Sequence, residues 1–471
     1  KALYALDRFD ETVSAARRVI ELNPESADAH NLLGAALSSL GQNNEAREIF
    51  QRVIEMNPYH ASAHNNLGHE LGRRGQILAA IASYRQAVAL KRNYFEAHSN
   101  ILCAMTNLIE PPSNYLTEAL YYGESIAKKV SSQFTTWQCD PQPKRLMVGL
   151  VSPDLCSHPV GYFLESLLEQ LNDADIELIA YSTLDRVDEL TLRIKPYFSH
   201  WRVVSGMSDQ VAAQRIHDDG IHILFDLSGH TTKNRLPIFA WKPAPVQTTW
   251  LGYFASTGVV EMDYLLADAH VAPDSEESHF TETVWRLPNS YLCFTPPHVA
   301  QAVVPLPALL SQQITFGCFN NLTKMNDAVV ALWSRVLLSV ENSRLFLKTA
   351  QLSSPAICES TRQKFAAHGI AADRLILEGS SPRTELLAAY HRMDIAMDPF
   401  PYPGGTTSVE ALWMGVPVLT KRGDRFLSHM GESIMHNADL SDWIARDEDD
   451  YVAKAIAFAG DLPKLAALRA G

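Results

Sequence analysis

Apolar and small residues recur with a period of 34 at the start of the chain. Ala46 and Ala80 are each followed four positions later by an aromatic residue, Phe50 and Tyr84, which is helical spacing. A small residue lets two helices approach closely, and a large one fills the gap beside it. The other repeated positions are Ala29-His30, Ala63-His64, Ala97-His98, Gly34, Gly68, Gly41, Gly75, Pro24 and Pro58. The pattern predicts stacked helix pairs over residues 1–105.

Beyond residue 145 the apolar residues gather in short runs separated by helical stretches. The first series of runs is Leu146–Val151, Ile176–Tyr181, His222–Leu227, Val246–Trp250 and Tyr264–Ala267. The second series is Thr315–Phe319, Arg344–Lys348, Leu375–Leu377, Ile395–Met397 and Val416–Leu419. Buried strands that alternate with helices form parallel sheets covered on both faces. We therefore expect two Rossmann-like α/β lobes, 145–308 and 309–471, joined to the α-helical repeats by a helical connector at 106–144.

Composition narrows the classes of protein that fit. A content of 46% hydrophobic and 20% charged residues is globular, and the net charge of −13 argues against a general nucleic-acid partner. No apolar run reaches the roughly 18 residues of a membrane span. The six cysteines are scattered without a CxxC pair, which is typical of reduced thiols rather than of disulfides or a zinc site. No signal peptide is visible, so we expect a cytoplasmic location and a start inside a longer protein.

Candidate chemistry in the first lobe follows the ends of its strands, where ligands bind in parallel sheets. Asp154 and His158 stand four residues apart after the first strand, where they could serve as base, orienting group or donor, or only cap the next helix. His230 follows the third strand and either lines a cleft or caps a turn. Glycines such as Gly252 let the backbone approach a ligand closely.

The second lobe carries a candidate site for a diphosphate. Lys324 follows a strand end, where its point charge suits a diphosphate leaving group, although an ordinary surface lysine is the alternative. The turn Gly404-Gly405-Thr406-Thr407 opens a helix and offers N–H groups, hydroxyls and the positive end of the helix dipole. A plain N-cap would explain one threonine but not the double glycine, and no Walker loop is present. Glu410, one turn later, could hold two ribose hydroxyls.

These motifs resemble known families. The 34-residue repeat resembles the tetratricopeptide repeat. The stretches Val148–Pro159, Lys242–Gly252, Gly317–Lys324 and Asp394–Pro417 resemble the family of O-linked N-acetylglucosamine transferase and SPINDLY, glycosyltransferase family 41, in its bacterial members. The resemblance implies a GT-B fold and inverting transfer of a sugar from a nucleotide diphosphate to a serine or threonine hydroxyl. It implies no cofactor and no metal.

The resemblance also implies roles for individual residues. Asp154 and His158 would lie beside the donor sugar and diphosphate, either one helping the acceptor lose its proton, and Lys324 would neutralise the departing diphosphate. The further residues that the resemblance implies in donor binding are Leu251, Gly252, Asn321, Arg383, Thr406, Thr407 and Glu410, and the turn geometry adds Gly404 and Gly405.

The repeats carry a candidate acceptor site. Asn66 and Asn100 each follow the repeat alanine by three residues, on the helix that lines the concave face. An asparagine there can bind the backbone of an extended peptide without reading its sequence. We therefore expect a protein or peptide acceptor on this face, and a homodimer through the repeats is one further possibility.

The donor is the most open part of the prediction. UDP-GlcNAc is the leading expectation because it is the commonest donor in the family. Gly405 and Leu386 replace histidines of the animal enzymes, and Gly229-His230-Thr231 is closer to SPINDLY, whose donor is GDP-fucose. The remaining alternatives are a bacterial surface-protein or flagellin glycosyltransferase with another donor, and a repeat scaffold with an inactive transferase domain.

Overall fold

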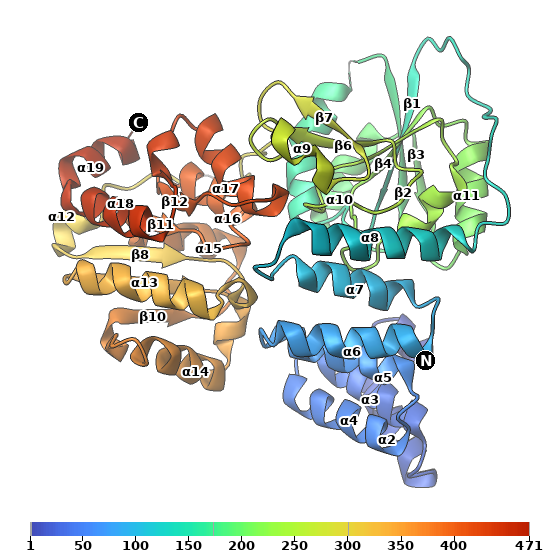
Figure 1. Cartoon of the computed structure of the whole chain (residues 1–471), viewed down its shortest axis with the longest axis horizontal. Helices are drawn as coiled ribbons and strands as arrows, with labels where there is room; N and C mark the ends of the chain where they lie inside the picture. Colours follow the sequence, from blue (N-terminus) through green and yellow to red (C-terminus); the bar gives the residue numbers. More distant parts are fainter. Residues whose placement is uncertain (1, 173, 300, 471) are drawn as a thin grey trace. The chain divides into compact units, whose positions relative to one another are not determined.

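The computed structural model describes residues 2–172, 174–299 and 301–470 and divides into two compact units (Figure 1). Unit 1 comprises the chain up to Ser131 together with His230–Lys233, and unit 2 comprises Ser132–Gly229 and the chain from Asn234 onward. The predicted connector at 106–144 crosses this division, because its helix belongs to unit 1 and its last residues belong to unit 2.

Unit 1 is built from helix pairs, drawn in blue to teal in Figure 1. Its helices are α1 Ala2–Ala5, α2 Phe9–Leu22, α3 Ala27–Ser39, α4 Asn43–Met56, α5 Ala61–Arg73, α6 Ile77–Leu90, α7 Phe95–Met105 and α8 Pro112–Ala127. The small–large pattern packs as predicted, since a Cβ added at Gly34 would lie 2.7 Å from the Phe50 ring, and one at Gly68 would lie 2.7 Å from the Tyr84 ring. The repeated glycines therefore let paired helices approach around buried aromatic side chains.

The first sheet of unit 2 has seven strands, all parallel, in the order β3-β2-β1-β4-β5-β6-β7. The strands are β1 Leu146–Ser152, β2 Ile176–Ser182, β3 His200–Val203, β4 Ile223–Asp226, β5 Val246–Thr249, β6 Tyr264–Asp268 and β7 Thr283–Leu287. The sequence prediction missed β3 and β7. Both are edge strands whose residues are largely exposed or half-buried, so neither carries a continuous apolar run.

The second sheet has six parallel strands in the order β10-β9-β8-β11-β12-β13. They are β8 Ile314–Cys318, β9 Ser343–Lys348, β10 Leu375–Glu378, β11 Ile395–Met397, β12 Val418–Lys421 and β13 Ile444–Ala445. Only β13, an edge strand of two residues, was not predicted. The predicted fold class, a helical repeat followed by two parallel α/β lobes, is confirmed.

Helices cover the two sheets of unit 2. The α-helices are α9 Pro159–Leu171, α10 Glu189–Ile194, α11 Asp209–Asp218, α12 Ala308–Ser311, α13 Asp327–Ser339, α14 Pro355–Ala366, α15 Arg383–Ala389, α16 Thr406–Trp413, α17 Phe426–Asn437, α18 Glu448–Gly460 and α19 Leu462–Ala470. The 3₁₀ helices are η1 Lys195–Tyr197, η2 Leu236–Trp241, η3 Asp274–His279, η4 Leu322–Lys324, η5 Ala350–Ser353, η6 Ala372–Arg374, η7 Tyr390–Arg392 and η8 Ser441–Trp443. Within the described residues, every helix is too short or too polar to cross a membrane.

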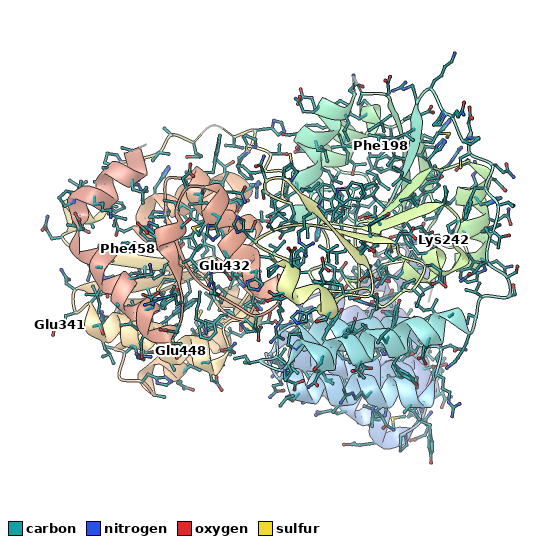
Figure 2. The ribbon with its side chains drawn as sticks, turned by 45° about the horizontal axis from the view of Figure 1, so that its top comes forward. Phe198, Lys242, Glu341, Glu432, Glu448 and Phe458 are labelled. Atoms are coloured by element: carbon teal, nitrogen blue, oxygen red, sulfur yellow. The ribbon has the colours of Figure 1, made fainter. Side chains whose placement is uncertain are left out.

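Helix α17 belongs to the cores of both lobes. Its residues Phe426 and Met430 pack into the core of the first lobe, whereas Met435 packs into the core of the second. Polar contacts accompany this packing: Ser433 Oγ donates to Asp268 Oδ2 at 2.6 Å, and His429 Nε2 lies 3.0 Å from Glu276 Oε1. The side chains along α17, with Glu432 labelled, are drawn in Figure 2. One buried helix therefore holds the two lobes of unit 2 together.

Candidate active site

Lys324 ends η4, the turn that follows β8. Its Nζ donates to Asn320 Oδ1 at 3.1 Å and to the Pro403 carbonyl at 2.8 Å, and it lies 3.7 Å from the centre of the Tyr402 ring. Burial lowers the pKa of Lys324 to about 8, although the Asp398 carboxylate opposes the shift. The ammonium is thus fixed in place and still charged at neutral pH. Lys324 is not the freely solvated surface lysine of the alternative interpretation.

The double-glycine turn lies beside Lys324. Asp398 Oδ1 accepts the Gly404 N–H at 3.0 Å and the Ser408 hydroxyl at 2.8 Å, which folds the turn over the start of α16. A Cβ at Gly404 would collide with Ser408 Oγ, so the turn requires glycine there. Gly405 is the N-cap residue and Thr406 the first residue of α16, so the free N–H groups of a helix terminus are available at this turn.

The side-chain hydroxyl and the backbone carbonyl of Thr407 are both hydrogen-bonded. Its hydroxyl lies 3.0 Å from Asn320 Oδ1, and its carbonyl accepts the Tyr390 hydroxyl at 3.1 Å. Asn320, which the sequence interpretation passed over, therefore contacts both Lys324 and Thr407. Asn321 has a different position: its Oδ1 accepts the Thr323 N–H at 2.9 Å and the Gln351 amide at 2.6 Å, so this residue shapes the η4 turn.

Arg383 and Glu410 form an ion pair. Their side chains lie 2.6 Å apart, between Nη2 and Oε1, and Glu410 is only 2% exposed. Burial raises the pKa of Glu410, and the Arg383 guanidinium opposes this shift. Arg383 also lies 4.5 Å from the ring of Tyr162 in the first lobe. Two residues expected to contact the nucleotide separately thus contact each other.

Asp154 and His158 lie at the start of α9. His158 Nδ1 accepts the Val160 N–H at 3.3 Å and caps this helix, as the structural alternative predicted, while the same nitrogen lies 3.6 Å from Asp154 Oδ1. Burial and the nearby Asp226 carboxylate raise the pKa of Asp154 to about 6. Burial and Arg186 lower the pKa of His158 to about 4. At neutral pH the pair is therefore a carboxylate beside a neutral ring.

The loop after β5 offers backbone rather than side chains. Leu251 has a positive φ of 72°, and its side chain is buried in the core of the first lobe. A Cβ at Gly252 would collide with the Leu227 carbonyl oxygen, so this backbone packs directly on the loop that follows β4.

Ring contacts within unit 2 bring the strand-end loops of its two lobes together. The rings of Phe254 and Tyr402 lie 5.9 Å apart, which places the loop of Gly252 near the Lys324 turn. Arg383 makes the second contact, on Tyr162 of α9, the helix that His158 caps. These two contacts bring the loop after β5 and helix α9 of the first lobe beside Tyr402 and Arg383 of the second lobe.

His230 belongs to unit 1. Its side chain is only 1% exposed, its Nδ1 lies 3.1 Å from Ser99 Oγ, and its ring packs edge-on against Tyr122 at 4.6 Å. Contact of His230 with a donor stays a prediction; of the two alternatives that the sequence left open, a cleft position or a turn cap, this burial does not match the cleft position. Sequence could not reveal it, because Ser99 and His230 are 131 residues apart in the chain.

The repeat asparagines form a ladder of amide contacts. Asn66 Nδ2 donates to Asn31 Oδ1 at 3.1 Å, and Asn100 Nδ2 donates to Asn65 Oδ1 at 3.0 Å. Asn31 and Asn65 were not predicted, although they stand at the repeat interval in the sequence. We call these four residues the asparagine ladder. Their contact with an acceptor stays a prediction.

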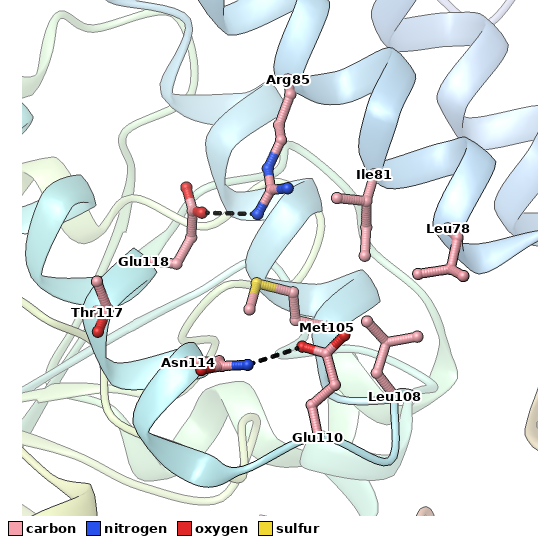
Figure 3. A pocket seen from close by; sticks show the side chains of 9 residues that line it. All are labelled: Leu78, Ile81, Arg85, Met105, Leu108, Glu110, Asn114, Thr117 and Glu118. Carbon is pink, nitrogen blue, oxygen red and sulfur yellow. Dashed lines mark hydrogen bonds and ion pairs between the residues drawn. The ribbon is translucent and has the colours of Figure 1, made fainter.

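A cavity of about 410 Å³ lies in unit 1 among α6, α7 and α8 (Figure 3). Its lining residues are Leu78, Ile81, Arg85, Met105, Leu108, Glu110, Asn114, Thr117 and Glu118. Polar groups of the lining pair with one another, since Arg85 lies 3.2 Å from Glu118 and Asn114 donates to Glu110 at 3.3 Å. These residues are not among those predicted for the site.

Across the described parts of the chain, no three histidine, cysteine or carboxylate side chains gather as a potential metal site. Metal-independent transfer stays a prediction.

Comparison with known proteins identifies the family. The family model "Glycosyl transferase family 41" matches residues 124–301 and 299–471, and tetratricopeptide-repeat models match residues 1–61 and 61–94. The chain belongs to glycosyl transferase family 41. The predicted family and repeat type are confirmed.

Relatives of this family 41 chain match about two thirds to four fifths of its length. The "Probable UDP-N-acetylglucosamine--peptide N-acetylglucosaminyltransferase SPINDLY" of Solanum lycopersicum is 37% identical over 386 residues, which cover 78% of this chain and 40% of that protein. The correspondingly named SEC protein of Arabidopsis thaliana is 30% identical and covers 69% of this chain and 34% of its own length. The chain thus spans well under half the length of these curated relatives.

A solved structure aligns with nearly the whole family 41 chain. A mutant of the O-GlcNAc transferase of Thermobaculum terrenum superposes with a TM-score of 0.91 at 35% identity. The alignment covers 97% of this chain and 88% of that one. That transferase therefore shares the fold elements of this chain, the helical repeats and the two α/β lobes.

Proposed function

We propose that this family 41 protein transfers a sugar from a nucleotide diphosphate to a serine or threonine hydroxyl of a protein, with inversion and without a metal. The observation that carries the proposal is the fixed Lys324 ammonium beside the N-terminus of α16. A cation and free helix N–H groups stabilise a diphosphate as it gains negative charge. They supply the charge that a divalent cation provides in other transferases.

The acceptor hydroxyl attacks the anomeric carbon on the face opposite the diphosphate. A new bond forms to the acceptor oxygen, the bond from the sugar to the diphosphate oxygen breaks, and the acceptor proton passes to a base. Of the two candidates, Asp154 is the better base, because its pKa of about 6 lies closer to neutral pH than the value of about 4 for His158.

A lysine substitution tests this mechanism directly. Lys324→Ala is expected to lower the rate of transfer by about a hundredfold or more, because the leaving group loses its positioned cation. Lys454→Ala on α18 removes the same charge from the same lobe and serves as the matched control. Undiminished transfer by Lys324→Ala would exclude this mechanism. A wild-type protein that binds partners without any transfer would instead favour the scaffold alternative.

UDP-GlcNAc is the donor that we propose. The names of the SPINDLY and SEC relatives specify UDP-N-acetylglucosamine, and the solved neighbour is named an O-GlcNAc transferase. Thermal unfolding with UDP, GDP or CMP tests the base. We expect stabilisation by UDP. Stabilisation by GDP alone would replace this donor with GDP-fucose, and stabilisation by CMP alone would point to another sugar.

The asparagine ladder is proposed to hold the acceptor polypeptide. An asparagine amide offers two donor hydrogens and two acceptor lone pairs, so the amide contacts within the ladder leave capacity for a peptide backbone. Asn66→Ala combined with Asn100→Ala should raise the KM for a protein acceptor and leave hydrolysis of the donor unchanged. Asn44→Ala, on the second helix of its repeat, is the matched control. An equal loss of transfer and of donor hydrolysis would contradict this role.

A further inference from the structure

Asn320 holds two of the predicted donor contacts through a single atom. Lys324 Nζ lies 3.1 Å from Asn320 Oδ1, and Thr407 Oγ1 lies 3.0 Å from the same oxygen. A lysine ammonium can only donate, so the atom that faces it must be the amide oxygen. The Thr407 hydroxyl, which faces that oxygen too, must therefore donate its only proton to Asn320.

The amide of Asn320 is itself fixed. Its nitrogen end donates to Cys318 Sγ at 3.5 Å, and the residue is 9% exposed. It stands between the end of β8 and the η4 turn, so its backbone is held by the strand on one side and by the turn on the other. Thr407 is equally restrained, because Tyr390 donates to its carbonyl.

We infer, on the basis of the proposed function, that Asn320 is a positioning residue and that it gives Thr406 and Thr407 different roles toward the donor. It holds the Lys324 ammonium at the α16 terminus and turns the Thr407 proton away from the donor. The diphosphate then receives hydrogen bonds from Lys324, from the N–H groups of the turn and from the Thr406 hydroxyl. Thr407 can offer the ligand only a lone pair while it stays bonded to Asn320.

A double-mutant cycle tests the link between Asn320 and Thr407. The variants are Asn320→Ala, Thr407→Val and the pair together, assayed for kcat/KM with UDP-GlcNAc, or with GDP-fucose if GDP alone stabilises the wild type. We expect Thr407→Val to cost about tenfold, and Asn320→Ala to cost at least as much because it also removes the contact with Lys324. The double change should cost no more than Asn320→Ala alone, because the hydrogen bond between the two side chains can be lost only once. Thr406→Val is the matched control, and its effect should multiply with that of Asn320→Ala.

A pH profile separates positioning from a purely structural role. Asn320→Asp keeps the size of the side chain and both acceptor contacts, and it places a negative charge beside the ammonium. A neighbouring carboxylate favours the charged form of lysine, so the alkaline limb of the rate profile should move to higher pH than in the wild type. A residue that stabilised the fold without contacting Lys324 would leave this limb in place.

The outcomes distinguish this inference from the function on which it rests. If the wild type neither binds UDP or GDP nor transfers sugar, the proposed function fails. If the wild type is active but Asn320→Ala and Thr407→Val multiply, or Asn320→Asp leaves the alkaline limb unmoved, only the inference fails. Circular dichroism checks that each variant folds. If Asn320→Ala does not fold, the variants Thr407→Val and Asn320→Asp provide the test.

Discussion

Arg383 Nη2 and Glu410 Oε1 lie 2.6 Å apart, and this contact pairs two residues that were each expected to bind the nucleotide. Glu410 lies within the first turns of α16 and is buried, whereas Arg383 begins α15 and is about one-third exposed. Any donor contact made through one of these side chains is consequently coupled to the other.

The first prediction concerns the stability of this pair. Arg383→Met leaves the buried Glu410 carboxylate without its partner and should lower the free energy of unfolding by about 2 kcal/mol, less than for a fully buried pair because water reaches Arg383. Arg383→Met with Glu410→Gln should recover part of that loss, since the buried charge is gone. Urea denaturation measures both. A double variant whose losses simply add would argue against the coupling.

The second prediction concerns the pH dependence of transfer. Lys324 has a pKa of about 8 and must be charged, so the rate should fall as the pH rises through about 8. Asp154 has a pKa of about 6 and must be ionised as a base, so the rate should rise through about pH 6. Lys324→Arg should act more slowly but lose the alkaline limb, because a guanidinium stays charged. Profiles of kcat/KM between pH 5 and about 10 check both limbs. If the alkaline limb is unchanged in Lys324→Arg, that limb belongs to a group other than Lys324.

The third prediction concerns the glycine turn. Gly404→Ala places a Cβ against Ser408 Oγ and 3.0 Å from Asp398 Oδ1, so the turn must shift. A displaced donor site should lower the rate by about a hundredfold. Gly460→Ala is the matched control, because a Cβ there meets nothing within 4 Å, and it should stay within about 0.5 kcal/mol of the wild type. Calorimetric binding of UDP and the transfer rate test both variants; tight binding and full activity in Gly404→Ala would contradict the prediction.

The fourth prediction concerns the α17 contact between the lobes. Burial alone would lower the pKa of His429, but the hydrogen bonds to Glu276 and Glu432 outweigh it and raise the value to about 9. A raised folded-state pKa stabilises the protein fully below the unfolded value of about 6.5, and this contribution disappears as the pH rises through about 9. Its size is about 3 kcal/mol.

Denaturation of the wild type and of His429→Gln checks this prediction at pH 6, 8 and about 10. The wild type should be the more stable protein at pH 6, and the difference should shrink toward the highest pH. A difference that stays constant across this range would mean that the imidazole is not the titrating group.

The sequence by itself determined the architecture. The 34-residue period specified the helix pairs, because close approach of helices needs a small residue opposite a large one at a fixed interval. The central strands were also readable, since strands buried on both faces are continuously apolar. The same reasoning missed β3, β7 and β13, whose exposed positions at the sheet edges impose no such pattern. Strand ends then indicated where Asp154 and Lys324 would lie.

Only the tertiary structure decided which of these residues are partners. Asn320 and Thr407 are 87 positions apart, so no local period links them, and their hydrogen bond exists because two strand-end loops meet at one edge of a sheet. The pairing of Arg383 with Glu410 arises in the same way, from two helix starts brought together. Burial is also a tertiary property: the sequence left both a cleft position and a turn cap open for His230, whereas the folded chain packs its ring against Tyr122. A sequence pattern specifies an interval, whereas a hydrogen bond needs atoms about 3 Å apart, and only the folded chain sets that distance.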